Sequence, residues 1–497
     1  MSTMTKTIIV SFSFLMIIVS FLIGWWAKKK VTTSEAYFGS TGMFGPFTVG
    51  LSSTAAVASA FALVGVPGLM YSTGNAMCFW MLSSAAFAMA YLILGKKVRA
   101  MSEIGKVASL GDLSDLRYNN NKVIKITMSL TLFLGCVAYL AAQIKAGSEL
   151  FAHLMGWDPL LTGFVIFGVL ALYMAISGEV GGLLTQAFQG LVMIVAGAVI
   201  IAAFFNITGG FGEVLRVTAE AEAVTVNNIT KEFSPDMFNA WGSMPRVVAM
   251  SWMLIPILGT VGQPQVITRM YALKDPKDMP KMGMYTALSH TMVGLLTLVV
   301  ANGALYLVAT GKIDPLVSGD RAIYALADYS GVVAQLFVYA GVLAAAMSSA
   351  SLFLSICSTV VSRDIPNALG LKFEPKKQVQ ISRISMLVLG IASIIFSITQ
   401  GEMVGILGTF GWGTLMSATF PVFVIGLLWR RANEKGVMCG SVVGLALNII
   451  SFAGFKWPGA LPWYFNVVAL SIAVTVFVSL VTKEQEINKK LEAVIEL

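Results

Sequence analysis

One apolar stretch decides the fold, because it cannot be a regular helix along its whole length: Leu51-Ser-Ser-Thr-Ala-Ala-Val-Ala-Ser-Ala-Phe-Ala-Leu-Val-Gly65-Val-Pro67-Gly68. It carries no charge, as a segment surrounded by lipid requires, yet Gly65, Pro67 and Gly68 interrupt a helix. The small residues before them let a neighbouring helix come close. The stretch therefore predicts a helix that is broken in mid-membrane.

A second stretch has the same character: Trp252-Met-Leu-Ile-Pro256-Ile-Leu-Gly259-Thr-Val-Gly262-Gln-Pro264. Glycine and proline are common in ordinary membrane helices, so either stretch alone would decide little. The two lie five predicted spans apart, and interrupted helices at matching places in two halves of a chain indicate the binding site of a transporter.

The composition requires lipid around most of the chain. Of the 497 residues, 57% are hydrophobic and 12% are charged, whereas about a quarter of a soluble domain is charged. The mean hydropathy is +0.81. We therefore predict an all-α integral membrane protein of about thirteen transmembrane helices, at 7–26, 47–72, 76–95, 124–148, 159–177, 182–207, 243–267, 283–310, 331–362, 383–400, 402–429, 436–455 and 463–482.

The distribution of basic residues predicts the orientation. An odd number of spans places the two termini on opposite sides, and basic residues concentrate in cytoplasmic loops. Most of the 33 lysines and arginines fall on one side, in the segments 28–30, 96–125, 269–281, 363–383, 430–435 and 483–497. We expect the N-terminus outside and the C-terminus in the cytoplasm. Compact loops favour a bacterial inner (plasma) membrane.

Several function classes are excluded by missing motifs. The chain has no G-x-x-x-x-G-K-[ST], no G-x-S-x-G and no metal-ligand cluster, which argues against a nucleotide motor and an enzyme. The net charge of +8 follows from the loop bias and does not indicate nucleic acid. No Asp or Glu lies near the middle of a span, as a proton relay would need. An alkali ion needs only carbonyl and hydroxyl oxygens beside an unwound helix.

The ninth predicted span carries such oxygens. Its sequence Ala344-Ala-Ala-Met-Ser-Ser-Ala-Ser351 places two adjacent hydroxyls, Ser348 and Ser349, next to the Ala345 carbonyl. Hydroxyls on an apolar helix also serve as contacts between helices, or bond back to their own helix. From spacing alone, both interpretations stay open.

At these residues the chain resembles the sodium:solute symporter family. The resemblance rests on the ninth-span motif, on Gly262-Gln-Pro-Gln-Val-Ile-Thr-Arg269, and on Pro421-Val-Phe-Val-Ile-Gly-Leu-Leu-Trp-Arg-Arg-Ala-Asn-Glu-Lys-Gly436. The last motif and the glycine-rich break are closest to members that carry pantothenate and monocarboxylates.

The resemblance implies a five-plus-five inverted repeat of the leucine-transporter kind, within a single transmembrane domain spanning 1–497. One helix precedes the repeats and two follow them. The expected parts are a leading helix at 7–26, repeats at 47–207 and 243–429, two trailing helices at 436–482 and a cytoplasmic tail at 483–497.

The resemblance also implies a site for sodium, the coupling ion. Its expected oxygens belong to Ala55, Ala58, Ala345, Ser348 and Ser349. Family members commonly carry an Asp, linked to sodium release inward, where this chain has Gln186. Proline carriers have an Asp at the position of Val57, and sugar carriers have a Gln at that of Ala62, so these departures argue against both solutes.

We expect the solute beside the two breaks, where free N–H groups can hold a carboxylate. The expected contacts are Ser59, Ala60, Phe61, Trp252, Pro256, Thr260 and Gln263. The predicted function is sodium-coupled symport of a small organic solute (a monocarboxylate, a pantothenate-like acid or an amino acid) by alternating access. A sodium-independent or proton-coupled carrier, motivated by Gln186, and a transporter-like sensor are the alternatives. The oligomeric state stays open.

Overall fold

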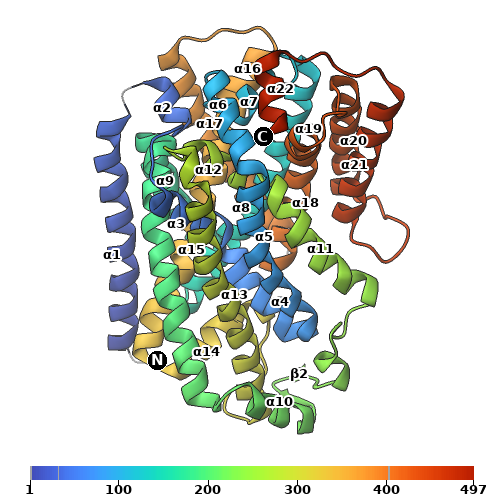
Figure 1. Ribbon diagram of the computed structural model, residues 1–497. Helices are drawn as coiled ribbons and strands as arrows, with labels where there is room; N and C mark the ends of the chain where they lie inside the picture. The colour runs from blue at the N-terminus through green and yellow to red at the C-terminus, as the bar shows by residue number, and fades with distance from the viewer. Residues whose placement is uncertain (1–2, 32, 401–402) are drawn as a thin grey trace.

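The computed structural model describes residues 3–31, 33–400 and 403–497, and the described chain is almost entirely helical (Figure 1). A short antiparallel hairpin joins β1 (Val224–Val226) to β2 (Ile229–Lys231). The longer helices and the segments that continue them are α1 (Thr3–Ala27), α3 (Pro46–Val57), η2 (Phe61–Gly65), α4 (Val66–Thr73), η3 (Asn75–Leu82), α5 (Ser83–Ala90), η4 (Tyr91–Gly95), α6 (Lys96–Ile104), α8 (Lys122–Met155), α9 (Pro159–Thr208), α11 (Arg246–Gly262), α12 (Pro264–Ala272), α13 (Met279–Ala309), α15 (Val332–Thr359), η8 (Val360–Asp364), α17 (Pro375–Gln400), α18 (Val404–Thr419), η9 (Phe420–Ile425), α19 (Gly426–Leu428), α20 (Glu434–Phe452) and α21 (Trp463–Val481).

Short helices cover the two ends of this bundle. They are η1 (Lys28–Lys30), α2 (Ser34–Phe38), α7 (Leu110–Arg117), α10 (Phe211–Glu220), η5 (Pro235–Phe238), η6 (Pro276–Asp278), η7 (Gly319–Arg321), α14 (Ala322–Ser330), α16 (Ile365–Ala368) and α22 (Lys489–Glu496). Figure 1 shows α2, α6, α7, α16 and α22 at one end, which we call the basic end, and α10, α14 and β2 at the other, which we call the hairpin end. The N-terminus lies at the hairpin end and the C-terminus toward the basic end.

The predicted number of thirteen spans is not confirmed. Among the described residues, ten helices are long and apolar enough to cross a membrane, or eleven if the bent pair Pro46–Val57 and Phe61–Thr73 forms one span. The predicted span 159–177 appears as a shorter apolar helix, Leu160–Ile176. The predicted span 76–95 is divided among η3, α5 and η4. The all-α membrane architecture itself is as predicted.

The first helix break lies earlier than the sequence predicted. It separates α3 from η2 at residues 58–60, where the chain bends by 54°. Gly65 and Pro67 instead lie inside a continuous helix, because η2 is a π-helical turn in which the Val66 amide bonds to the Phe61 carbonyl. Pro67 therefore falls in the first turn of α4, the position in a helix where proline is best tolerated.

The glycines of this segment allow close packing. A β-carbon on Gly65 would lie 2.6 Å from the Gly405 nitrogen, and one on Gly68 would lie 2.8 Å from the Gly319 carbonyl carbon. The broken helix therefore touches the start of α18 and the loop before α14 backbone to backbone. These contacts close the bundle at the hairpin end of the first broken helix.

Helix α15 is the centre of the bundle. The most apolar segment of its span is completely buried, whereas only 28% of the corresponding segment of α1 is buried. It packs against α1, α3, α8 and α9. A helix enclosed on every side can carry hydroxyl groups only where neighbouring elements provide hydrogen-bond partners. The serines of α15 accordingly lie against the break that follows α3.

Gly178 divides α9 into the two predicted spans. Its φ of 57° and ψ of −152° belong to a region that only glycine adopts readily. A β-carbon there would lie 2.4 Å from the Tyr37 carbonyl oxygen. Any other residue at position 178 would therefore suffer both backbone strain and a steric clash with Tyr37.

We predict that Gly178→Ala destabilises the protein by about 1–3 kcal/mol, the range for a residue held in a disfavoured backbone conformation. Thermal melting of the purified protein measures the change. Gly168→Ala is the matched control, because Gly168 lies in the same helix with open space around it, and alanine there should raise the melting temperature slightly. Equal melting temperatures for the two variants would contradict the account.

Candidate sodium and solute site

The break in the first helix frees backbone groups inside the bundle. Helix α3 ends at Val57, and Ala58 has a non-helical ψ of 62°. The last carbonyls of a helix have no partner within that helix. At membrane depth the lipid offers no hydrogen-bond partners, so such groups depend on other elements of the protein.

Two serines of α15 meet these carbonyls. The Ser348 hydroxyl oxygen lies 2.7 Å from the Ala55 carbonyl and 3.0 Å from the Ala345 carbonyl, and its single proton can be donated to either. The Ser349 hydroxyl donates to the Ala56 carbonyl at 3.1 Å. All of these residues are fully buried. The structure thus brings together four of the five residues predicted to hold sodium, namely Ala55, Ala345, Ser348 and Ser349.

Ala58 and Ala56 differ from the expectation. The Ala58 amide closes the last turn of α3 by bonding to the Thr54 carbonyl at 2.6 Å. It is Ala56, which the sequence did not single out, whose carbonyl faces Ser349. The hydroxyls are free to rotate their protons away, because each hydroxyl oxygen also has lone pairs. Neutral carbonyl and hydroxyl oxygens of this kind can replace the hydration shell of an alkali ion.

Residues on both sides of the break satisfy its N–H groups. The Ala60 amide donates to Gln143 Oε1 at 3.0 Å, and the Phe61 amide donates to Ser59 Oγ at 3.2 Å. Ser59 Oγ also lies 2.8 Å from the Tyr139 hydroxyl. These amides already have protein partners, so a solute carboxylate would need to displace Gln143 or Ser59 to use them. The expectation of free N–H groups at this break does not hold in this conformation.

Aromatic rings surround the break. Phe61 stacks on Trp252, with centroids 6.4 Å apart and planes 17° apart. Tyr139 lies against Phe353 at 4.6 Å and Trp412 at 6.4 Å. The structure confirms that Phe61 and Trp252 lie together, while the sequence missed the other three rings and Gln143. No local break or polar run marks them in the sequence.

The second break lies at Gln263, between α11 and α12, inside the predicted interruption. Gln263 Nε2 donates to the Trp412 carbonyl at 2.9 Å. Its buried Oε1 has no hydrogen-bond partner among the described residues. Thr260 is fully buried one turn earlier, and the Pro256 side chain lies outside the described residues. A buried amide oxygen without a donor is a plausible acceptor for a solute N–H group.

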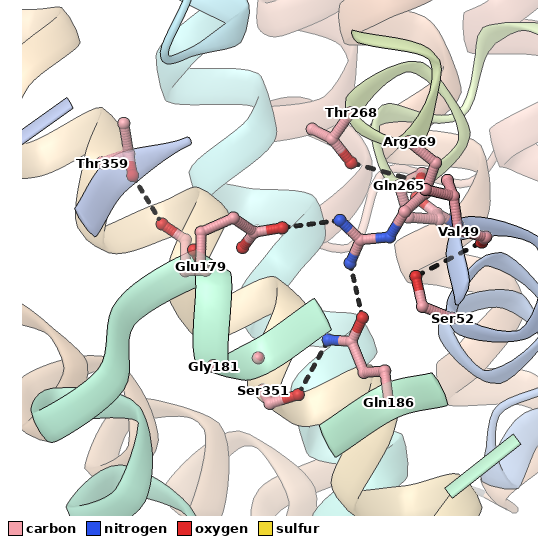
Figure 2. Close-up of polar contacts among 12 residues, drawn as sticks. Val49, Ser52, Glu179, Gly181, Gln186, Gln265, Thr268, Arg269, Ser351 and Thr359 are labelled. Atoms are coloured by element: carbon pink, nitrogen blue, oxygen red, sulfur yellow. Dashed lines mark hydrogen bonds and ion pairs between the residues drawn. The ribbon is translucent and has the colours of Figure 1, made fainter. Parts of the chain in front are cut away.

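Gln186 belongs to a buried polar network next to the serines (Figure 2). Its Nε2 donates to Ser351 Oγ at 3.0 Å, and its Oε1 accepts from Arg269. Arg269 also pairs with Glu179 at 2.6 Å. Ser351 Oγ donates to the Ser348 carbonyl at 2.7 Å, which connects the network to the hydroxyl cluster.

Arg269 does not belong among the basic residues of the cytoplasmic loops. The sequence placed it in a basic cytoplasmic segment, but its side chain is fully buried. The neutralising partner, Glu179, is 90 residues away in the chain, so local sequence gave no signal for the pair. Pairing and hydrogen bonding are what make a guanidinium tolerable at such a depth.

The arrangement defines a class of protein: a helical membrane transporter with a cluster of neutral oxygens beside a broken helix. A model of the sodium:solute symporter family matches residues 37–444. The chain belongs to the sodium:solute symporter family. It is therefore a multi-pass plasma membrane protein that couples the transport of a small solute to sodium, and it is not an enzyme.

Individual relatives cover most of the chain. The osmoregulated proline transporter OpuE of Bacillus subtilis (strain 168) is 28% identical over 451 residues, which are 86% of this chain and 85% of the relative. A sodium/proline symporter of Staphylococcus aureus (strain JH9) is 26% identical, covering 97% and 96%. The solved structure of a sodium-coupled sialic acid symporter has a TM-score of 0.76 at 18% identity, covering 96% and 99%. This likeness supports the leucine-transporter type of fold.

We predict that Ser348→Ala and Ser349→Ala each raise the half-saturating sodium concentration for uptake roughly 10–100-fold, because each removes one charge-assisted contact. Sodium titration of uptake in proteoliposomes measures this. Ser358→Ala is the matched control, since Ser358 lies on the same helix and donates to Ser355 of its own helix. An unchanged sodium requirement in both variants would refute the assignment.

We also predict that Arg269→Met lowers stability by about 3–5 kcal/mol, because it leaves Glu179 buried without its charge partner. Arg269→Met combined with Glu179→Met should recover much of the loss, since both charges are then gone. Thermal melting measures both variants. Lys281→Met is the control for an exposed pair, with Asp278, and should change little. No recovery in the double variant would contradict the account.

Proposed function

We propose that this symporter carries a small zwitterionic amino acid into the cell together with sodium. The observation that carries the proposal is the contact of Ser348 and Ser349 with the Ala55 and Ala56 carbonyls near the end of α3. These carbonyls lie three to six residues before Ser59 and Phe61 in the chain. The oxygen cluster and the aromatic surface are thus built on the same break. The relatives named above, described as proline transporters, favour an amino acid over the monocarboxylate or pantothenate that the motifs favoured.

Coupling follows from this shared break. Sodium bound by the proposed oxygens would fix the end of α3 against α15, and with it the position of Ser59 and Phe61. A solute that binds those residues then favours the sodium-bound arrangement. Because linkage is reciprocal, the solute must strengthen sodium binding by the same factor.

The polar contacts suit a zwitterion. Ser59, hydrogen-bonded to Tyr139, supplies hydroxyls for a carboxylate. The unpaired Gln263 Oε1 supplies an acceptor for an ammonium group. The departure at Val57 leaves L-proline as one candidate among small amino acids rather than the single choice.

We further propose that the basic end faces the cytoplasm, because lysine and arginine concentrate there. Two features of the described conformation support movement of the solute toward the basic end. Backbone contacts at Gly65 and Gly68 close the hairpin end. A pocket lined by Glu179, Ser355 and Thr359 lies on the side of the oxygen cluster that faces the basic end. Ser351 and Ser355 continue the hydroxyl face of α15 toward it.

Uptake into proteoliposomes tests the proposal. L-proline, other small amino acids, monocarboxylates, pantothenate and a sugar are offered under an inward sodium gradient, then with sodium replaced by choline. We expect uptake of an amino acid that disappears in choline. Uptake of a monocarboxylate or pantothenate alone would overturn the amino acid assignment. Uptake that persists in choline and follows a proton gradient would establish the sodium-independent alternative.

A variant separates the solute site from the sodium site. We predict that Tyr139→Phe raises the KM for the solute about threefold to tenfold, because it removes one hydrogen bond to Ser59. The half-saturating sodium concentration, measured at saturating solute, should change less than in Ser348→Ala. A rise in the half-saturating sodium concentration as large as in Ser348→Ala would contradict the separation of the solute site from the sodium site.

A further inference from the structure

An open pocket lies at the basic end, in a part of the molecule that neither the solute site nor the sodium site uses. It is bounded by the end of α1 with η1, by α2, by the end of the first half of α9 and by the start of α17 (Figure 1). Its walls include three cations, Lys28, Lys376 and Arg383. None of the described residues that line it is acidic. The described walls therefore carry positive charge only.

These three cations have no carboxylate partner within the protein. No ion pair among the described residues includes any of them. Other cations at the same end are neutralised: Arg363 pairs with Asp112 at 2.9 Å. Arg430 pairs with Glu484 at 2.7 Å. A pocket in which only cations gather, without partners, favours an anionic ligand.

Arg383 is held at the pocket through one of its three nitrogens. Its Nε donates to the Ala175 carbonyl at 2.8 Å, at the end of the first half of α9. The Tyr37 hydroxyl, which belongs to another wall of the pocket, lies 3.4 Å from the same carbonyl. Because the Arg383 side chain is exposed, its terminal N–H groups can reach a ligand. A planar fork of this kind suits two oxygens of one phosphate group.

Two tryptophans place the pocket at the level of the lipid headgroups. Trp25 and Trp26 lie in the last turn of α1 and are 54% and 51% exposed. Tryptophan is enriched where membrane proteins cross the membrane–water interface. The Lys28 ammonium lies 5.5 Å from the centroid of the Trp25 ring, and that of Lys30 lies 4.6 Å from the centroid of Trp26. The lysines after α1 therefore lie at the depth of the lipid phosphates.

Apolar surfaces continue from the pocket toward the middle of the membrane. Directly after Arg383, α17 exposes a row of branched apolar side chains, namely Ile384, Leu387, Val388, Ile391 and Ile395. The helices α1 and α9 also meet at the pocket, and they expose Leu15, Ile18, Leu22 and Leu172. A phosphate bound in the pocket would thus have apolar surface beside it for acyl chains. A soluble phosphate compound would leave this surface unused.

We propose that this pocket binds an anionic phospholipid of the cytoplasmic leaflet, with the phosphate held by Lys28, Lys376 and Arg383. Basic pockets between helices on the cytoplasmic side suit the headgroups of such lipids. The pocket selects a lipid with net negative charge, such as phosphatidylglycerol, because the ammonium group of a zwitterionic lipid would meet only cations. The leaflet rests on the proposed orientation of the basic end, while the site does not depend on which solute is carried.

Native mass spectrometry of the purified full-length protein tests this by titration with dioleoylphosphatidylglycerol and, separately, with dioleoylphosphatidylcholine, which has the same chains. We expect phosphatidylglycerol to bind about tenfold or more tightly, since only this lipid leaves its phosphate charge uncompensated. Inorganic phosphate and glycerol 3-phosphate are then added as competitors, and neither should displace the lipid at millimolar concentration. Displacement by either would assign the pocket to a soluble phosphate compound and overturn the lipid assignment.

Variants locate the binding in the pocket. Lys28→Gln combined with Lys376→Gln, and Arg383→Gln alone, should each weaken phosphatidylglycerol binding about tenfold, the effect of losing charged hydrogen bonds. Phosphatidylcholine binding should not change. The matched control is Lys489→Gln combined with Lys490→Gln. These two exposed lysines of α22 lie at the same end but outside the pocket lining, so the control removes as much charge as the first variant.

Melting temperatures separate lipid binding from folding. Without added lipid, the Lys28 and Lys376 double variant should melt like the wild type, because both side chains are exposed. Added phosphatidylglycerol should raise the melting temperature of the wild type and of the α22 control, but not that of the pocket variants. Equal affinity for the two lipids, or equal phosphatidylglycerol binding in the pocket variants and the wild type, would overturn the site. An equal loss in the α22 control would also overturn it, because the charge of the whole basic end would then attract the lipid.

Discussion

The structure depends on one unwound turn, residues 58–60, in the interior of a membrane protein. Lipid offers no hydrogen-bond partners at that depth, so each freed carbonyl and amide needs a partner from the protein, a solute or an ion. Ser348 and Ser349 satisfy the carbonyls at the end of α3, while Gln143 and Ser59 satisfy the amides that begin the next segment. Each partner is neutral and replaceable, so an ion or a solute can take over these contacts without leaving a charge exposed to lipid.

The buried network of Arg269 follows the same rule, that each buried polar group needs a partner. A guanidinium in the bundle requires a carboxylate, and Glu179 supplies it; Gln186 then uses one end of its amide for Arg269 and the other for Ser351. An Asp at position 186 would present only acceptor oxygens to both neighbours. Gln186 instead donates a hydrogen bond to Ser351, so this serine accepts one hydrogen bond from Gln186 and donates another to the Ser348 carbonyl. The departure from the family pattern is thus matched by the surrounding hydrogen bonds.

The sequence predicted the membrane class and the existence of the broken helices, because these follow from local composition, and the family resemblance supplied most of the oxygen cluster. Spacing alone placed Ser348 and Ser349 near the Ala345 carbonyl but left their role open. The position of the first break could not be predicted, because Pro67 lies after a π-helical turn that no local pattern in the sequence marks. Gln143 and Arg269 were missed or misplaced for the same reason: their partners, Ala60 and Glu179, are 83 and 90 residues away in the chain.

The glycines explain how such a structure can move. Gly65 and Gly68 meet Gly405 and Gly319 backbone to backbone, so no side chain separates the segments at these two contacts. Backbone surfaces of this kind can separate without forcing buried side chains into new rotamers, unlike a packed core, which resists small displacements. The polar network around Arg269, by contrast, joins α9, α12 and α15 through directional bonds. The glycine contacts lie on one side of the site, and the hydrogen-bonded Arg269 network lies beside it. The two sides therefore differ in their resistance to opening, which is what alternating access requires.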